Sequence, residues 1–395
     1  MRTSAVLASL SLPSTAARGG REKDAIIVGA GPAGVACAAM MREAGLEPLV
    51  LEKGNTIASV WRRHYDCLHL HTERAFSHLP GMAMPRSYPR FPSRLQVIDY
   101  LEAYAAKFDV RPAYHVEVRS IMRNGTDWDV DCGASTLSAP IIVVAAGWAS
   151  FPFRPACPGL DGYTGTVIHS CEYRNAAPFV DKRVLVVGYG NSGGEIALDL
   201  VRSKIDTTLS VRGPIQVMPR TVLGISTVTL GMFQRKIPAR LADLLNIPLL
   251  ILSTGNLDKI GLRRTGKGPR RLVEEDGRAP IIDIGTLEKI RDGTVKVRGA
   301  VARFTCDGVV FQNSGAEVYD AVIFATGFRT DLRQMLPGAS HALDVDGYPL
   351  VSGASCGEPG LYFCGSTVSP AGQLREVGIE AKRIAQLAKH HLGRQ

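Results

Sequence analysis

The sequence lacks the cysteine spacings that redox-active and metal-binding cysteines require. It contains eight cysteines, but no two of them form a CxxC or CxxxxC pair. Scattered cysteines of this kind are typical of reduced, structural thiols in the cytoplasm. We therefore expect neither a thiolate metal site nor a mechanism that depends on a redox-active cysteine pair.

The sequence also lacks an apolar run of membrane-spanning length, since IPLLIL is short and follows Asn246. Stable membrane insertion is not expected, and we expect a cytoplasmic protein. The first 21 residues contain three arginines and no acidic residue. Residues 1–22 are therefore interpreted either as a flexible tail or as an organelle-targeting segment.

Acidic residues are scarce in one segment of the chain. The 395 residues carry a net charge of +9, but 202–303 hold 19 Lys or Arg against 9 Asp or Glu, a net of +10. The basic stretch RRTGKGPRR, 263–271, is either a solvated loop or a site for an anionic ligand. No recognition motif accompanies it, so nucleic-acid binding is not expected.

Glycines at fixed spacing mark a first nucleotide-binding loop. The strand DAIIVG precedes Gly29, Gly31 and Gly34, and a helix follows. In such a loop the glycines make the tight turn, admit a pyrophosphate and let the helix pack closely on the strand. Glu52 ends the next strand, 18 residues after Gly34, where a carboxylate binds ribose hydroxyls.

A second loop repeats the pattern at Gly188, Gly190 and Gly193. The following strand leads to Arg212, 19 residues after Gly193, where the first unit has its acid. An arginine there pairs with a 2′-phosphate that a carboxylate would repel. The alternative is that Arg212 only solvates a strand end. We interpret the first loop as an FAD site and the second as an NADPH site.

The order of elements predicts the domain organisation. We expect an α/β fold with two Rossmann-like dinucleotide-binding domains, in which the NADP domain is inserted into a discontinuous FAD domain. The expected parts are 1–22, a tail; 23–178, the first part of the FAD domain; 179–320, the NADP domain; and 321–395, the second part of the FAD domain.

Without a cysteine pair at the flavin, electrons should pass to oxygen or to a diffusible acceptor. Here the chain resembles the class B flavin monooxygenases, whose signature is FxGxxxHxxx(Y/F). The matching stretch is YTGTVIHSCEY, with Tyr163, Gly165, His169 and Tyr173. Baeyer–Villiger enzymes continue with Trp-Pro, whereas this chain has Tyr173-Arg174, which argues against ketone-to-ester chemistry.

Within that class the sequence is most similar to the YUCCA family of plant enzymes. The matching stretches are 58–110, VLVVGYGNSGGEIALDL, VRGPIQVMPR, RAPIIDIGTLEKI and VIFATGF. The departures are Ala145-Ala146-Gly147, where Ala-Thr-Gly is usual, and the N-terminus. The resemblance implies an enzyme of auxin biosynthesis that uses NADPH, FAD and O2. It would form a C4a-hydroperoxyflavin and decarboxylate an aryl 2-oxo acid, as in indole-3-pyruvate to indole-3-acetate.

Two other functions remain open from the sequence. The same cofactors serve N- or S-oxygenation of a soft nucleophile, and a flavoprotein that senses NADP(H) without catalysis needs the same loops. A homo-oligomer is also left open.

Histidines gather near the end of the first nucleotide unit. The YUCCA resemblance places His71 next to the flavin, where an imidazole can tune the oxygen adduct; the alternative is a histidine satisfied in the core. His64, His69 and His78 lie nearby, but no partner has ligand spacing, so no metal is expected. Trp61 is interpreted either as a wall of the flavin site or as core packing, and His169 as an organiser of the linker.

The cofactor contacts that we expect come from both loops, the strand ends and the start of the last helix. They are Gly29, Gly31, Pro32, Ala33, Gly34, Glu52, Lys53, Trp61, Leu70, His71, Val118, Ala146, Gly188, Gly190, Asn191, Ser192, Gly193, Arg212, Ala325, Thr326, Gly327, Gln373 and Leu374.

Overall fold

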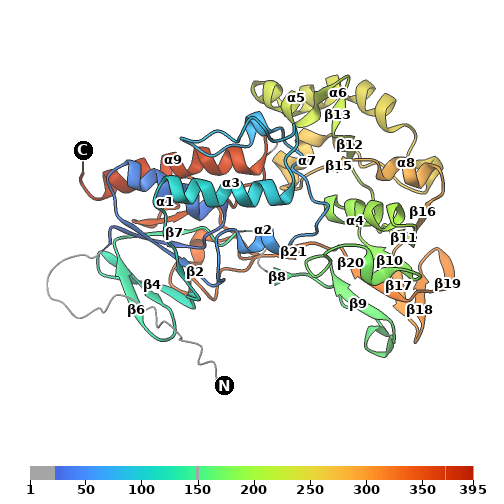
Figure 1. The fold of residues 1–395 in the computed structure, drawn as a ribbon, viewed down its shortest axis with the longest axis horizontal. Coiled ribbons are helices and arrows are strands. Elements are labelled where there is room, and N and C mark those ends of the chain that lie inside the picture. Colours follow the sequence, from blue (N-terminus) through green and yellow to red (C-terminus); the bar gives the residue numbers. More distant parts are fainter. Residues whose placement is uncertain (1–22, 148–150, 370, 395) are drawn as a thin grey trace, which may run out of the picture.

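Two parallel five-stranded sheets dominate the computed structural model, which describes residues 23–147, 151–369 and 371–394 (Figure 1). This confirms the predicted α/β class with two Rossmann-like domains. The expectation for residues 1–22 lies outside the described residues. No helix in the described ranges is long and apolar enough to cross a membrane.

The first sheet has the strand order β22-β7-β1-β2-β3, and all neighbours run parallel. Its strands are β1 (Ala25–Val28), β2 (Pro48–Glu52), β3 (Ala113–Tyr114), β7 (Ile141–Val144) and β22 (Leu361–Phe363). Strand β22 comes from the last fifth of the chain, so this domain is discontinuous, as predicted.

Side chains of β1 alternate between two cores, because successive residues of a strand face opposite sides of the sheet. Ala25 and Ile27 face the helical side, whereas Ile26 and Val28 face the other side. The helices are α1 (Pro32–Glu43), α3 (Arg94–Lys107) and α9 (Gln373–His391). The opposite face packs on the antiparallel strands β4 (Ser120–Asn124), β5 (Asp127–Asp131) and β6 (Thr136–Ala139).

The second sheet repeats this architecture, with the order β16-β11-β10-β20-β9. Its strands are β9 (Thr166–His169), β10 (Arg183–Val187), β11 (Asp206–Ser210), β16 (Val295–Arg298) and β20 (Ala321–Phe324). Helices α4 (Asn191–Arg202) and α8 (Thr286–Arg291) cover one face. The other face meets the antiparallel strands β17 (Val301–Phe304), β18 (Gly308–Phe311) and β19 (Ser314–Val318).

The predicted limits of the inserted domain, 179 and 320, are wrong as limits of this sheet. Strand β9 begins at Thr166, and β20 follows residue 320, yet β20 pairs with both β10 and β9. An apolar strand carries no local signal of which sheet it joins, because parallel pairing is made with segments far away in the sequence. The two linkers between the sheets also pair with each other, as β8 (Phe151–Pro152) and β21 (Phe328–Arg329).

A smaller helical part lies between β11 and β16, at the upper right of Figure 1. Its helices are α5 (Thr227–Phe233), α6 (Ala239–Thr254) and α7 (Pro269–Asp276). They accompany the parallel pair β12 (Val217–Pro219) and β15 (Ile281–Asp283), and the hairpin β13 (Thr221–Val222) and β14 (Ile225–Ser226). Helix α2 (Ser59–Arg63) belongs to the first domain.

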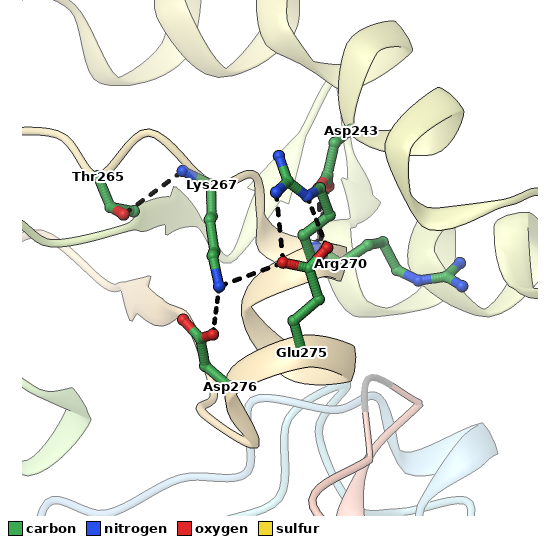
Figure 2. Close-up of polar contacts among 7 residues, drawn as sticks. Asp243, Thr265, Lys267, Arg270, Glu275 and Asp276 are labelled. Carbon is green, nitrogen blue, oxygen red and sulfur yellow. Dashed lines mark hydrogen bonds and ion pairs between the residues drawn. The ribbon is translucent and has the colours of Figure 1, made fainter.

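The basic stretch 263–271 leads into α7, whose acids pair with it. Figure 2 shows Lys267 between the carboxylates of Glu275 and Asp276, and Glu275 also pairs with Arg271. Asp243 of α6 accepts hydrogen bonds from the backbone N–H groups of Arg270 at 2.9 Å and Arg271 at 3.1 Å. These contacts satisfy donors at the start of α7. They favour a structural role for this stretch over a site for an anion.

Candidate active site

A cavity of about 1050 Å³ extends between the two nucleotide loops. Most of the predicted cofactor contacts line it: Gly29, Gly31, Pro32, Ala33, Glu52, Lys53, Trp61, Leu70, His71, Val118, Ala146, Gly190, Asn191, Ser192, Ala325, Gly327, Gln373 and Leu374. The predicted residues that do not line it are Gly34, Gly188, Gly193, Arg212 and Thr326. Three of these are glycines that shape the two loops.

The first loop is built around close backbone approaches. Gly29 has a φ of +103°, and a Cβ on it would lie 2.7 Å from the carbonyl oxygen of Ala145. A Cβ on Gly34 would lie 1.8 Å from the carbonyl oxygen of Gly29. Neither position can accept a side chain. Gly31 differs, because its Cβ would meet no atom within 4 Å at the N-terminus of α1. That open space, beside free N–H groups, suits a pyrophosphate.

The second loop repeats these contacts almost atom for atom. A Cβ on Gly188 would lie 2.6 Å from the Ala325 carbonyl oxygen, and one on Gly193 would lie 2.0 Å from the Gly188 carbonyl oxygen. Gly190 again has no atom within 4 Å of the added Cβ, at the N-terminus of α4. Both loops therefore fit a dinucleotide by the same geometry.

Glu52 is buried at the end of β2, and its carboxylate is already well occupied. It accepts hydrogen bonds from the N–H groups of Ala30 and Gly54 and from the Ser59 hydroxyl, each at 2.8 Å. A carboxylate offers about four acceptor positions, so roughly one remains for a ribose hydroxyl. These three bonds fix the direction in which Glu52 faces the cavity.

Arg212 lies one residue beyond the structural counterpart of Glu52 in the second nucleotide-binding unit. The N–H of Gly29 donates to the Leu51 carbonyl, and the N–H of Gly188 donates to the Ser210 carbonyl. Leu51 and Ser210 are therefore equivalent, which makes Val211 the counterpart of Glu52. The acid is replaced by an apolar residue, and Arg212 follows it. Its side chain is exposed and forms no ion pair with any described residue.

Asn191 lines the cavity, but its side chain holds a neighbouring strand. Its Oδ1 accepts from the Ile282 N–H at 2.7 Å, and its Nδ2 donates to the Pro280 carbonyl at 3.5 Å. These bonds fix β15 to the second loop. The side chain of Thr326 likewise donates to the Phe153 carbonyl in the linker. Both residues therefore have structural partners.

His71 is joined to a buried acid from the other domain. Its Nε2 lies 2.6 Å from Oε1 of Glu195 on α4, and the Glu195 side chain is only 2% exposed. The other oxygen of Glu195, Oε2, is buried and has no hydrogen-bond partner among the described residues. Glu195 is not among the site residues predicted from the sequence. The signal was an acid among the buried residues Gly194, Ile196 and Ala197 of α4.

Two further polar side chains surround this pair. Tyr65 is buried, and burial first and then the charge of Glu195 raise the pKa of its phenol well above the usual range. Burial lowers the pKa of His64, although Glu195 opposes the shift. Ser192, at the start of α4, faces Tyr65 and lines the cavity. A buried carboxylate therefore stands amid protonatable groups where the two domains meet.

Trp61 lies between the cavity and the core of the first domain. It lines the cavity, and it also packs partly buried against the core of the first domain. Its ring meets His64 edge-on, with the centroids 5.9 Å apart. No group of three or more His, Cys, Asp or Glu in the described ranges could hold a metal ion.

The residues of the monooxygenase signature hold the linker and β9. His169 is fully buried; its Nε2 lies 2.9 Å from the Gly327 carbonyl, and its Nδ1 accepts from the Cys171 N–H at 3.3 Å. The hydroxyl of Tyr163 donates to the Tyr319 carbonyl at 2.6 Å. A Cβ on Gly165 would collide with the Tyr163 ring. His169 thus organises the linker, as predicted.

Two cysteines that are distant in sequence meet in the core of the first domain. A hydrogen bond with Cys37, and then burial, raise the pKa of the Cys364 thiol well above its usual range. Both residues are fully buried, and neither lines the cavity. A protonated, enclosed thiol is unreactive. All eight cysteines are free, and this pair has a structural role.

Comparison with known proteins shows the family to which the chain belongs. The profile of the pyridine nucleotide-disulphide oxidoreductase family matches residues 26–237. The chain is 37% identical to indole-3-pyruvate monooxygenase YUCCA6 of Arabidopsis thaliana, covering 91% of this chain and 89% of that protein. It is 38% identical to indole-3-pyruvate monooxygenase YUCCA1 of Oryza sativa subsp. japonica, covering 87% and 86%.

Solved structures show the same fold at lower identity. The flavin-containing monooxygenase from Stenotrophomonas maltophilia has a TM-score of 0.71 and 21% identity, over 94% of this chain and 99% of that one. Cyclohexanone monooxygenase bound to ε-caprolactone has a TM-score of 0.72 and 17% identity, over 94% and 88%.

Paired nucleotide loops facing one cavity, together with these relatives, define a flavin-dependent monooxygenase that uses a pyridine nucleotide. Within that class the chain belongs to the YUCCA family, with relatives 36–38% identical over about 90% of its length. The resemblance inferred from the sequence is thus confirmed, as is the expectation of an oxidoreductase.

Proposed function

We propose that this enzyme catalyses the oxidative decarboxylation of an aryl 2-oxo acid of the indole-3-pyruvate type. The proposal depends chiefly on the identity to relatives named indole-3-pyruvate monooxygenases, which extends along most of the chain. The balanced reaction is 2-oxo acid + O2 + NADPH + H⁺ giving the shortened acid, CO2, NADP⁺ and water. The carbon–carbon bond beside the carboxylate breaks, and NADPH is the reductant.

The two loops divide the cofactors between them. The first loop would hold the FAD pyrophosphate at Gly31 and the N-terminus of α1, with Glu52 on the ribose. The second would hold the NADPH pyrophosphate at Gly190 and α4, with Arg212 beside the 2′-phosphate. FAD reduced by NADPH supplies the activated oxygen, and the enclosed cavity limits the access of water.

His71 is the protein group that we place beside this chemistry. It lines the cavity, and its Nε2 is occupied by Glu195, which leaves Nδ1 as the ring nitrogen without a partner among the described residues. A carboxylate only accepts hydrogen bonds, so it holds a proton on Nε2. It also offsets the positive charge when Nδ1 carries a second proton. Glu195 is thus a positioning residue for His71.

The test is a turnover assay with product analysis. Purified protein with FAD, NADPH and oxygen should convert indole-3-pyruvate to indole-3-acetate and CO2. If NADPH oxidation is stimulated only by amines or thioethers, the enzyme is an N- or S-oxygenase. If no compound stimulates it, a sensor of NADP(H) is favoured instead.

A further inference from the structure

The outer side of α6 is apolar although it faces away from the protein. Ala242, Asp243, Leu250 and Thr254 form its buried side, and the helix packs there on α7 and β12. The opposite side, which we call the apolar face, is exposed throughout. It consists of Leu241, Leu244, Leu245, Ile247, Pro248, Ile251 and Leu252. An exposed stripe over the whole length of a helix marks an interaction surface.

Neighbouring segments extend this apolar face. Phe233, at the end of α5, is 77% exposed, and Leu223 in the turn between β13 and β14 is 93% exposed. The next residue of the chain, Gln234, is held to Asn246 of α6 by hydrogen bonds of 2.8 and 3.1 Å, so α5 ends beside α6. Figure 1 shows α5, α6 and β13 at one edge of the molecule.

Within the segment 221–256, which carries the apolar face, the exposed charged residues are basic. Between residues 221 and 256 the sole acid is Asp243, which is buried and bound to the backbone of α7. Lys236 and Arg240 are exposed, and neither forms an ion pair with any described residue. Leucines combined with free cations and no exposed acid are typical of helices that lie in the headgroup layer of a membrane.

We propose that the apolar face of α6, with Phe233, docks peripherally on a membrane that contains anionic lipid. The positive charge of the exposed residues favours a membrane over a second copy of the chain as the partner of the apolar face. A symmetric dimer would bring Lys236 and Arg240 of both copies together, within a segment of net charge +10. Anionic headgroups complement those cations instead. Helix α6, at 16 residues, would lie on the surface and not cross it.

The proposed surface adjoins the active-site cavity. Leu249, Leu250 and Ser253 on the inner side of α6 line that cavity, as do Val228 and Leu230 of α5. Docking would therefore place one wall of the cavity next to the lipid. An apolar aromatic compound that partitions into the headgroup layer would then be concentrated beside the active site. This inference concerns location and does not depend on the proposed substrate.

Vesicle binding tests the proposal with the flavin-loaded full chain. We expect cosedimentation with vesicles of phosphatidylcholine and phosphatidylserine, about tenfold stronger than with phosphatidylcholine alone at low salt. Leu244→Glu/Leu245→Glu should abolish binding, and Lys236→Gln/Arg240→Gln should remove the preference for phosphatidylserine. Leu95→Glu on α3 is the matched control, because Leu95 is 60% exposed and Leu244 is 62% exposed. It should bind as the wild type does.

Light scattering of the same proteins measures their oligomeric state and so tests whether the apolar face joins two copies of the chain instead. All five changed side chains, that of the control Leu95 included, are exposed, so flavin content and the thermal midpoint should stay unchanged. The proposal is overturned if the wild type binds neither vesicle and is a dimer that Leu244→Glu/Leu245→Glu dissociates. It is also overturned if that variant binds vesicles as well as Leu95→Glu does.

Discussion

His71 of the first domain and Glu195 of the second share a hydrogen bond of 2.6 Å, next to the cavity that faces both nucleotide loops. The bond crosses from one dinucleotide-binding domain to the other. It therefore links His71, the residue that we propose acts in the oxygen chemistry, to the helix that begins at the second loop.

Glu195→Gln tests whether the charge of this acid matters. The amide keeps an acceptor for Nε2 of His71 but cannot offset a charge on the ring. We expect NADPH to reduce the flavin normally, while the yield of product per NADPH falls on the order of tenfold and hydrogen peroxide rises. The pH dependence of this yield should also change, which a purely structural effect would not cause.

Asp199→Asn is the matched control for that experiment. Asp199 lies one turn further along α4 and accepts from the Tyr173 hydroxyl at 2.6 Å. Its loss should lower the thermal midpoint without altering the pH profile of the yield. An Asp199→Asn variant that reproduced the altered profile would show that any lost carboxylate on α4 has this effect.

His71→Ala should separate reduction from oxygen use. Reduction of the flavin by NADPH without oxygen should proceed at a rate close to that of the wild type. After oxygen is added, most electrons should appear as hydrogen peroxide. Stopped-flow measurement resolves the two phases. A variant that lost reduction and kept its product yield would place His71 on the nicotinamide side.

The glycines of the first loop allow a paired test of the FAD site. Gly31 has a φ of −74° and open space around a built Cβ, so Gly31→Val should fold yet bind no flavin. Gly34→Ala should fail to fold, because its Cβ would lie 1.8 Å from the Gly29 carbonyl oxygen. Circular dichroism and the visible spectrum check both. Full flavin occupancy in Gly31→Val would remove the assignment.

Arg212→Ala tests which nucleotide the second loop selects. Loss of a charge-assisted pair with the 2′-phosphate costs ~1.5–3 kcal/mol, so the KM for NADPH should rise about ten- to a hundredfold. The KM for NADH should hardly change. Equal effects on both nucleotides would show that Arg212 does not read the phosphate.

The buried side chain of His169 should make the thermal stability of the protein depend on pH. Burial lowers the pKa of this histidine in the folded protein, so the unfolded chain binds more protons near and below pH 6.5. Its contribution is present above that pH and is lost as the pH falls. The thermal midpoint of the wild type should therefore drop more between pH 7.5 and 5.5 than that of His169→Gln. An equal drop in both would assign the acid sensitivity elsewhere.

The features that could be predicted from the sequence are those that depend on local sequence patterns. The glycine loops, the discontinuous first domain and the contact of His169 with the linker all follow from short motifs with fixed geometry. Long-range pairing carried no such signal. Strand β20 was assigned to the wrong sheet, Val211 and not Arg212 proved to be the counterpart of Glu52, and Cys37 met Cys364 across the core.

The contact between Glu195 and His71 is another long-range contact that the sequence could not predict, here within the site itself. An acid on a helix is usually solvated, and nothing near it in the sequence shows that His71, 124 residues away, lies at hydrogen-bond distance. Only the packing of α4 against the first domain brings the two together.

The most direct test of the account is the fate of the carboxyl carbon of indole-3-pyruvate. With [1-¹³C]indole-3-pyruvate, NADPH and ¹⁸O2, the purified flavin-loaded enzyme should release ¹³CO2 and form indole-3-acetate with one ¹⁸O atom in its carboxylate, in proportion to the NADPH consumed. If NADPH were consumed but the labelled carbon stayed in the 2-oxo acid, with all the oxygen recovered as hydrogen peroxide, the proposed decarboxylation would be contradicted.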